Sequence, residues 1–141
     1  MKIEKLMLNI MNERQLISLM NQTKWGRLTE GIASLAFPPA FQMKLLTEPE
    51  PFPPQFYEHI TYHGDWQHLE TESYCTSNIE WLKIRPYYYK KQGQLLPDQK
   101  IDCHFALGEL LKNSNIPFQK ENEDYIVFGY VTTSEGFLND E

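Results

Sequence analysis

The clearest pattern of hydrophobic and polar positions lies in the middle of the chain, at residues 79–85, where four apolar side chains are interspersed with three charged ones. β-Branched and aromatic residues favour a strand here, and Pro86 ends it because proline has no N–H to donate to a neighbouring strand. Apolar residues fall on both faces, so we expect an interior strand with Trp81 as a core anchor. Glu80 should lie at the rim, exposed to water or paired with Lys or Arg, and the alternative is a carboxylate that faces a partner.

Apolar residues at helical spacing predict three helices, which begin near the potential caps Asn12, Thr23 and Asp98. Breaks follow at Asn21, at Pro38 and near residue 113. The third helix should carry one apolar stripe, made by Ile101, Phe105, Leu107, Gly108 and Leu111. Residues 1–11 fit a short helix, an edge strand or an extension that precedes a start at Met11.

Further strand patterns lie at residues 41–47, in a hairpin formed by residues 57–63 and 66–69, and at residues 125–131, beside the central strand. Four prolines fall within six residues at 49–54 and predict a turn-rich loop. The strands cluster between helices without alternating with them. We therefore expect a single α+β domain over residues 1–141, with a partly frayed tail at 132–141. Its mostly antiparallel sheet should have about four to six strands, with helices mainly on one face.

The net charge of −6 argues against a nucleic-acid-binding surface, which needs a basic patch, and suits a basic protein partner. No segment has transmembrane length, and no signal peptide is recognisable, so we expect no membrane association. The two cysteines, Cys75 and Cys103, fit no disulfide framework, which favours reduced thiols in the cytoplasm. The sequence leaves the oligomeric state open.

Metal binding is not expected, although the chain offers ligands of the right type. None of them forms a paired spacing typical of zinc sites. His104 falls in the apolar stripe of the third helix and is expected to be a hydrogen-bonded structural histidine. The candidate ligands are His63, His68, Cys75, Cys103 and His104. No cofactor is expected either.

An acid, a base and an orienting group would meet if the predicted hairpin paired with the central strand and brought together Asp65, His68 and Glu80. No nucleophile elbow, phosphate-binding loop or glycine-rich dinucleotide turn accompanies these residues. We therefore assign no catalytic residue. An enzyme or a small-molecule-binding sensor with a pocket around these three residues remains the alternative function.

Three consecutive tyrosines follow the central strand, and they cannot all point inward if the segment is extended. Exposed aromatic residues are enriched at protein interfaces, and nearby carboxylates can steer a basic partner. We therefore expect a partner-binding surface formed by Asp65, Glu80, Tyr87, Tyr88 and Tyr89.

Four segments, at residues 21–25 (N-x-T-K-W), 64–66 (G-D-W), 79–84 and 126–131, together resemble a family of small uncharacterised bacterial proteins, a domain of unknown function. The resemblance covers about residues 12–131. The chain departs from the pattern of the family at the proline-rich segment 48–54. The resemblance implies a bacterial cytoplasmic protein and carries no catalytic assignment. Small acidic bacterial proteins of this kind are often suspected to be immunity proteins for polymorphic toxins, so we expect a non-enzymatic protein that binds a protein partner.

Overall fold

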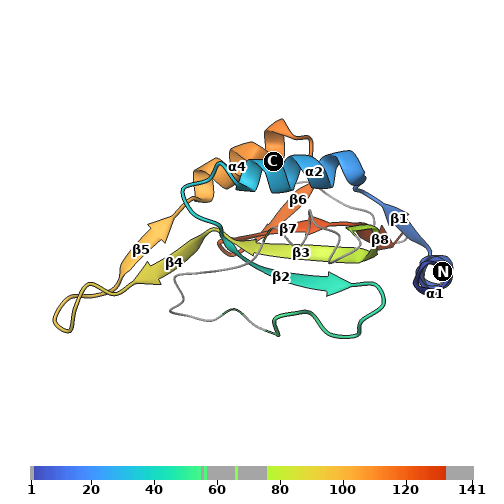
Figure 1. The fold of residues 1–141 in the computed structure, drawn as a ribbon, viewed down its shortest axis with the longest axis horizontal. Helices are drawn as coiled ribbons and strands as arrows, with labels where there is room; N and C mark the ends of the chain where they lie inside the picture. Colours follow the sequence, from blue (N-terminus) through green and yellow to red (C-terminus); the bar gives the residue numbers. More distant parts are fainter. Residues whose placement is uncertain (1, 55, 57–65, 67–75, 133–141) are drawn as a thin grey trace.

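The computed structural model describes residues 2–54, 56, 66 and 76–132 of the chain. Its centre is a four-stranded antiparallel sheet with strand order β2-β3-β7-β6 (Figure 1). These strands are β2 (Ala40–Leu45), β3 (Ile79–Arg85), β6 (Phe118–Glu121) and β7 (Asp124–Phe128). The predicted α+β fold with a mostly antiparallel sheet is confirmed.

Strand β3 is the interior strand that its sequence predicts. Leu82 in β3 lies opposite Met43 in β2 on one side and opposite Val127 in β7 on the other. The predicted strand at residues 125–131 does lie beside β3, but it is divided at Gly129 into β7 and β8 (Tyr130–Thr132). β8 pairs with the short strand β1 (Leu16–Ser18).

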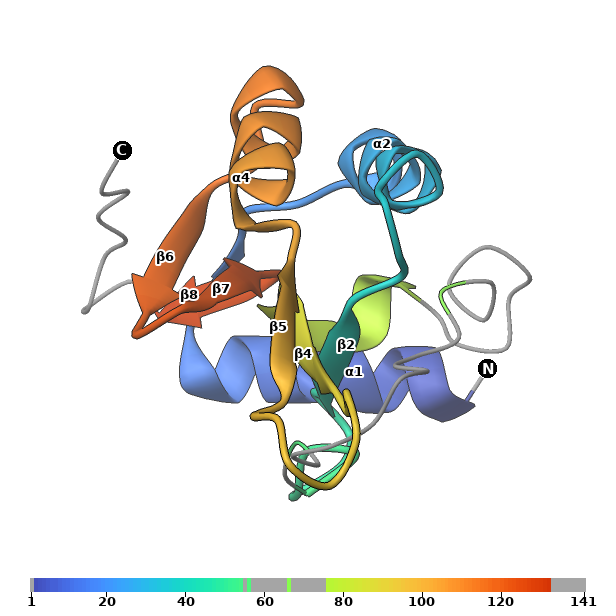
Figure 2. The ribbon, with the colours of Figure 1, turned by 90° about the vertical axis from the view of Figure 1, so that its left-hand side faces the viewer.

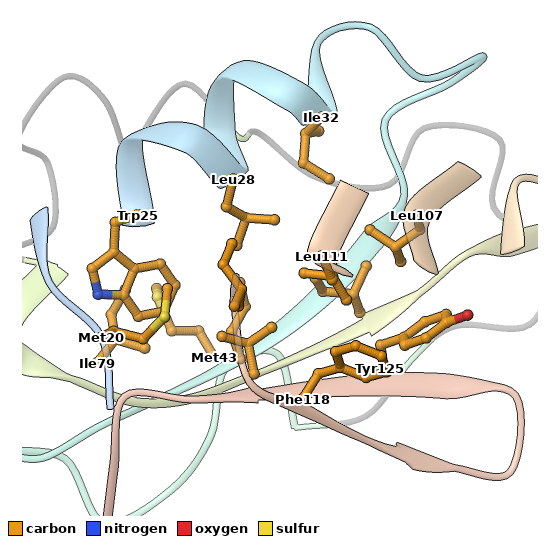
Figure 3. Packing of buried hydrophobic residues seen from close by; sticks show 14 of the residues in the cluster. Met20, Trp25, Leu28, Ile32, Met43, Ile79, Leu107, Leu111, Phe118 and Tyr125 are labelled. Atoms are coloured by element: carbon orange, nitrogen blue, oxygen red, sulfur yellow. The ribbon is translucent and has the colours of Figure 1, made fainter. Parts of the chain in front are cut away.

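Helices α2 (Gln22–Ile32) and α4 (His104–Asn113) cover one face of the sheet (Figures 1 and 2). The cap of α2 is Asn21, two residues before the predicted cap Thr23, and its side chain accepts a hydrogen bond from the Lys24 N–H at 2.8 Å. Figure 3 shows the core between helices and sheet, which includes Met20, Trp25, Leu28, Ile32, Met43, Ile79, Leu82, Leu107, Leu111, Phe118, Tyr125 and Val127. Burial of these apolar side chains is the main stabilising contribution to the fold.

The helix predicted to begin at Asn12 is wrong. Helix α1 (Lys2–Arg14) contains Asn12 and ends at Arg14, and residues 16–18 form β1. Gln15 separates the two elements with a positive φ of 54°, which a helix interior cannot accommodate. On α1, Met7 is buried against Leu46 and Tyr130 in a second, smaller core. Of the helix, the edge strand and the extension that fit the start of the chain, the helix is the one that residues 2–14 form.

The third predicted helix also begins later than expected. Residues 99–102 form β5 (Gln99–Asp102), which pairs with β4 (Tyr87–Lys90), and α4 starts at His104. Leu107 and Leu111 are buried as predicted, but Phe105 is 78% exposed. Residues two positions apart on a helix lie on different faces, so Phe105 cannot share the stripe of Leu107.

Trp81 is half-buried and lies outside the main core, so its prediction as a core anchor is wrong. Side chains alternate along the strand, and Leu82 and Ile84 are fully buried in the core, so Trp81 faces the opposite side of the sheet. A β-bulge lets Ile79 join the core as well: Lys44 pairs with Trp81, whereas the next residue, Leu45, pairs with Ile79, and the extra residue Glu80 shifts Ile79 to the face of Leu82. Trp25 and Trp66, by contrast, are buried.

The proline-rich loop at 48–54 packs along the edge of β2, as the Gln42 side chain donates hydrogen bonds to the carbonyls of Pro53 and Pro54 at 2.9 and 2.8 Å. The predicted hairpin at 57–69 lies outside the described residues except for Trp66, and so does the predicted tail beyond Thr132. Within the part that the structure describes, no helix is both long and apolar enough to cross a membrane.

Candidate functional site

Strands β4 and β5 form a two-stranded antiparallel ribbon that leaves the sheet at the end of β3 and extends to one end of the molecule (Figures 1 and 2). Pro86 separates β3 from β4, and the carbonyl of Pro86 accepts a hydrogen bond from the Cys103 N–H at 2.8 Å. The ribbon pairs Tyr87 with Asp102 and Tyr89 with Lys100. The loop at 91–98 closes it at the tip.

The three tyrosines are divided between the two faces of the ribbon, since successive side chains of a strand point to opposite sides. Tyr88 packs edge-on against Phe37, with 4.9 Å between ring centroids. Tyr87 and Tyr89 share the other face, with their ring centroids 5.9 Å apart. All three are half-buried, so each rigid aromatic side chain leaves part of its surface accessible to a partner.

Arg85 holds the base of the ribbon to the sheet. Its guanidinium donates two hydrogen bonds to the Asp124 carboxylate, at 3.1 and 3.2 Å. The same group lies 4.2 Å from the ring centroid of Phe56 and 5.3 Å from that of Tyr87. Burial alone would lower the pKa of Arg85, but the hydrogen bonds with Asp124 raise it, so the cation persists between the two rings.

A second cation secures the same end of the ribbon. Lys100 in β5 donates a hydrogen bond to Glu123, in the turn between β6 and β7. The Lys100 ammonium also lies 4.5 Å from the ring centroid of Tyr87. The base of the ribbon is therefore fixed by contacts to β3, β7 and the β6–β7 turn.

The tip of the ribbon exposes two adjacent leucines. Leu95 is 97% exposed and Leu96 is 58% exposed. The loop around them is internally braced, because the Gln92 side chain donates a hydrogen bond to the carbonyl of Pro97 at 3.0 Å. The mostly polar sequence of residues 90–99 predicts only a loop here. The one available signal was a pair of leucines that fits neither the helical nor the alternating pattern.

Glu80 lies at the opposite end of β3 and is paired with two cations. Its carboxylate accepts hydrogen bonds from Arg14 at 3.1 and 2.7 Å and from Lys44 at 3.2 Å. Burial alone would raise the pKa of Glu80, but the hydrogen bonds from Arg14 and Lys44 outweigh it and lower the pKa. The expected pairing with Lys or Arg is confirmed.

The structure brings Tyr87 and Tyr89 together but leaves Glu80 apart from them. Tyr87 follows Glu80 by seven positions of extended chain, which corresponds to about 20 Å at the rise of a β-strand. Asp65, the fifth residue of the predicted partner surface, lies outside the described residues. His68 does too, so the alternative site formed with Asp65 and Glu80 is not observed.

Cys103 and His104, two of the candidate metal ligands, have structural surroundings. Burial, with a smaller contribution from the Asp102 carboxylate, raises the pKa of the free Cys103 thiol to about 11, so it is protonated and a poor nucleophile at neutral pH. His104 is half-buried, and its Nε2 atom lies 3.3 Å from the Tyr125 hydroxyl. Among the described residues, no group of three or more His, Cys, Asp or Glu side chains could hold a metal ion. His63, His68 and Cys75 fall outside that part of the chain.

No curated protein and no solved structure is significantly similar to this chain. One protein family, described as a family of unknown function (DUF6678), matches residues 7–134. The match begins at Met7, the buried residue of α1, and ends shortly after β8. The predicted resemblance to a domain of unknown function is thereby confirmed, and the chain belongs to the family DUF6678.

Proposed function

We propose that this chain is a non-enzymatic protein of the bacterial cytoplasm that binds a protein partner through the β4–β5 ribbon. The observation that carries the proposal is the exposure of Leu95 and Leu96 at the tip of a ribbon whose base is fixed. An immunity protein that blocks a polymorphic toxin is one specific form of this function.

Burial of the tip supplies a physical reason for binding. A leucine side chain that moves from water into an apolar pocket contributes about 1.5–3 kcal/mol, and two adjacent leucines can enter one pocket. The base of the ribbon is already ordered by Arg85 and Lys100, which reduces the entropy lost on association. Tyr87 and Tyr89 lie on one face of the ribbon, between its base and its tip, and add rigid contact area.

The charge of the ribbon differs from that of the whole chain. Residues 87–102 carry three cations, Lys90, Lys91 and Lys100, and two anions, Asp98 and Asp102, which leaves one net positive charge. The whole chain has a net charge of −6. We therefore propose that the acidic body, Asp65 included, attracts a basic partner over a distance, while contact at the tip is apolar. Glu80 adds little to that field, because Arg14 and Lys44 already neutralise its charge.

The test uses the products of adjacent genes in the source genome as candidate partners. Each is co-purified with the full chain, and the complex is measured by surface-based kinetics. The variant Leu95→Ser/Leu96→Ser should bind at least about tenfold more weakly, mainly through faster dissociation. Leu8→Ser, at an α1 position that is also 58% exposed, is the matched control and should bind normally. A tight complex that tolerates the double change would show that the ribbon is not the binding site.

A further inference from the structure

A second candidate site lies at the opposite edge of the sheet from β2, between α4 and the edge strand β6 (Figure 2). It is a pocket of about 360 Å³. Phe118 and Tyr125 from the sheet and Phe105 from α4 supply its apolar lining. This size is at the lower end of small-molecule sites, which span about 300–1,000 Å³, and fits a ligand of one ring and one charged group.

Three polar groups from different elements meet in this pocket. The Nε2 atom of His104, the first residue of α4, lies 3.3 Å from the Tyr125 hydroxyl and 3.3 Å from the Lys120 ammonium. Burial, aided by the Asp102 carboxylate, raises the pKa of Tyr125, so the hydroxyl keeps its proton at neutral pH. A neutral histidine accepts one hydrogen bond at Nε2, and Lys120 has three N–H donors. Donors of Lys120 therefore remain for a bound ligand.

Gly108 in the middle of α4 is the residue that makes room for this arrangement. Glycine is unfavourable inside a helix, so its presence there calls for a packing reason. A Cβ atom at this position would lie 2.8 Å from the Tyr125 hydroxyl oxygen. A larger residue at this position would press on the hydroxyl that contacts His104, and Gly108 itself lines the pocket.

The charges in the pocket favour an anion. Lys112 and Lys120 carry two positive charges and Glu109 carries one negative charge, which leaves one net positive charge in a chain of net charge −6. Neither lysine forms an ion pair with a carboxylate within the described residues, although Lys83 and Lys100 both do. Uncompensated cations beside an exposed aromatic ring are typical of sites that bind acidic compounds.

We propose that the pocket binds a small organic anion, with its carboxylate or phosphate held by Lys120 and Lys112 and its planar apolar part lying against Phe105. Ligand binding in this pocket does not require the β4–β5 ribbon to bind its protein partner. Phe118 forms the floor at 2% exposure, and Phe105 forms the lip. The Tyr125 hydroxyl and His104 hold Lys120 toward the pocket.

The test is a titration of the isotope-labelled full chain, followed by backbone amide resonances. Phenyl phosphate and benzoate are the acidic probes, benzyl alcohol is the neutral probe, and inorganic phosphate is the probe without an apolar part. The acidic aromatic probes should shift the amides of residues 104–112 and 118–125 in a saturable manner. Benzyl alcohol should not do so, and inorganic phosphate should bind at least about tenfold more weakly than phenyl phosphate.

Two matched variants separate a specific site from general charge attraction. Lys120→Gln should weaken phenyl phosphate binding at least about tenfold, whereas Lys91→Gln removes the same charge from the ribbon and should leave it unchanged. Phe105→Ser, at an exposed position, should weaken phenyl phosphate but not inorganic phosphate. Equal losses with Lys120→Gln and Lys91→Gln, or no saturable shift at the named amides with either acidic aromatic probe, would overturn the proposal.

Discussion

Glu80 connects two parts of the fold that are distant in sequence. Arg14 comes from the last turn of α1, and Lys44 comes from β2, and both donate to the same carboxylate. The Glu80 side chain is only 15% exposed, so water cannot fully replace these partners if one is lost. Unlike an exposed ion pair, this cluster should therefore contribute measurably to stability.

Glu80→Gln should lower the free energy of unfolding by about 1–3 kcal/mol at about pH 7, as expected for hydrogen bonds between charged groups. The folded state lowers the pKa of Glu80 below its ordinary value of 4.5, so protonation favours the unfolded chain. The stabilisation is complete above that ordinary value and is lost as the pH falls through the lowered pKa. Urea unfolding at several pH values should show the difference between wild type and variant shrinking in acid.

Glu121→Gln provides a matched control for this cluster. Glu121 pairs with Lys83 at 2.6 Å, but its side chain is 54% exposed. Loss of the Glu121–Lys83 ion pair should lower the free energy of unfolding by less than about 1 kcal/mol, as for other surface ion pairs. Equal effects of the two variants would mean that the Glu80 cluster is as well solvated as the surface pair.

Pairing of Glu80 was predictable from the sequence, whereas the position of Trp81 was not. An ionised carboxylate on a strand of apolar residues must keep water or pair with cations, so pairing was one of two environments that chemistry allowed for Glu80. The face occupied by Trp81 depends on register, because a slip of one residue moves each side chain to the other side of the sheet. Residues 79–85 carry apolar side chains on both faces, so their pattern does not reveal that Leu82 and Ile84, rather than Trp81, face the main core.

At the level of elements, the two errors in helix prediction have one cause. Residues 16–18 and 99–102 are short segments that became strands through pairing with β8 and β4. Segments of three or four residues are too short to show either a helical or an alternating period, so the choice between helix and strand depends on partners supplied by the tertiary fold. Longer patterns that bury many side chains, such as those of α2 and β3, were predictable for that reason.

Two glycines should respond in opposite ways to the same change. A Cβ atom at Gly129 would lie 2.0 Å from the carbonyl oxygen of Ile79, at the β3 bulge. Gly129→Ala should therefore destabilise the protein by about 1–3 kcal/mol or more, because backbone atoms must move. A Cβ atom at Gly26 in α2 would meet nothing within 4 Å, so Gly26→Ala should stabilise by about 0.5–1 kcal/mol.

Denaturant unfolding of both glycine variants measures the difference directly. A Gly129→Ala protein as stable as wild type would contradict the close approach of β7 and β8 to the bulge. A loss of stability in Gly26→Ala would mean that the exposed side of α2 is covered in solution.

At the level of the whole molecule, the candidate site was only partly predictable. The tyrosines were identified because three aromatic residues in an extended segment cannot all be buried. The exposed leucines were missed, since their position at the end of a ribbon depends on where Pro86 directs β4 away from the sheet. The grouping of Glu80 with the tyrosines did not account for the length of β3, which places them at opposite ends.

The ribbon and the sheet should differ in their local stability. β3 is hydrogen-bonded on both sides and buries Leu82 and Ile84 completely, so its amides should exchange only when the whole domain unfolds. The ribbon has a single ladder and lies outside the main core cluster, so it can open with the domain folded. Native-state hydrogen exchange should therefore show the paired amides of residues 87–90 and 99–102 exchanging at least about tenfold faster than those of β3. Adding a saturating partner should slow the ribbon amides selectively, and equal protection of ribbon and β3 in the free protein would show that the ribbon is part of the global folding unit.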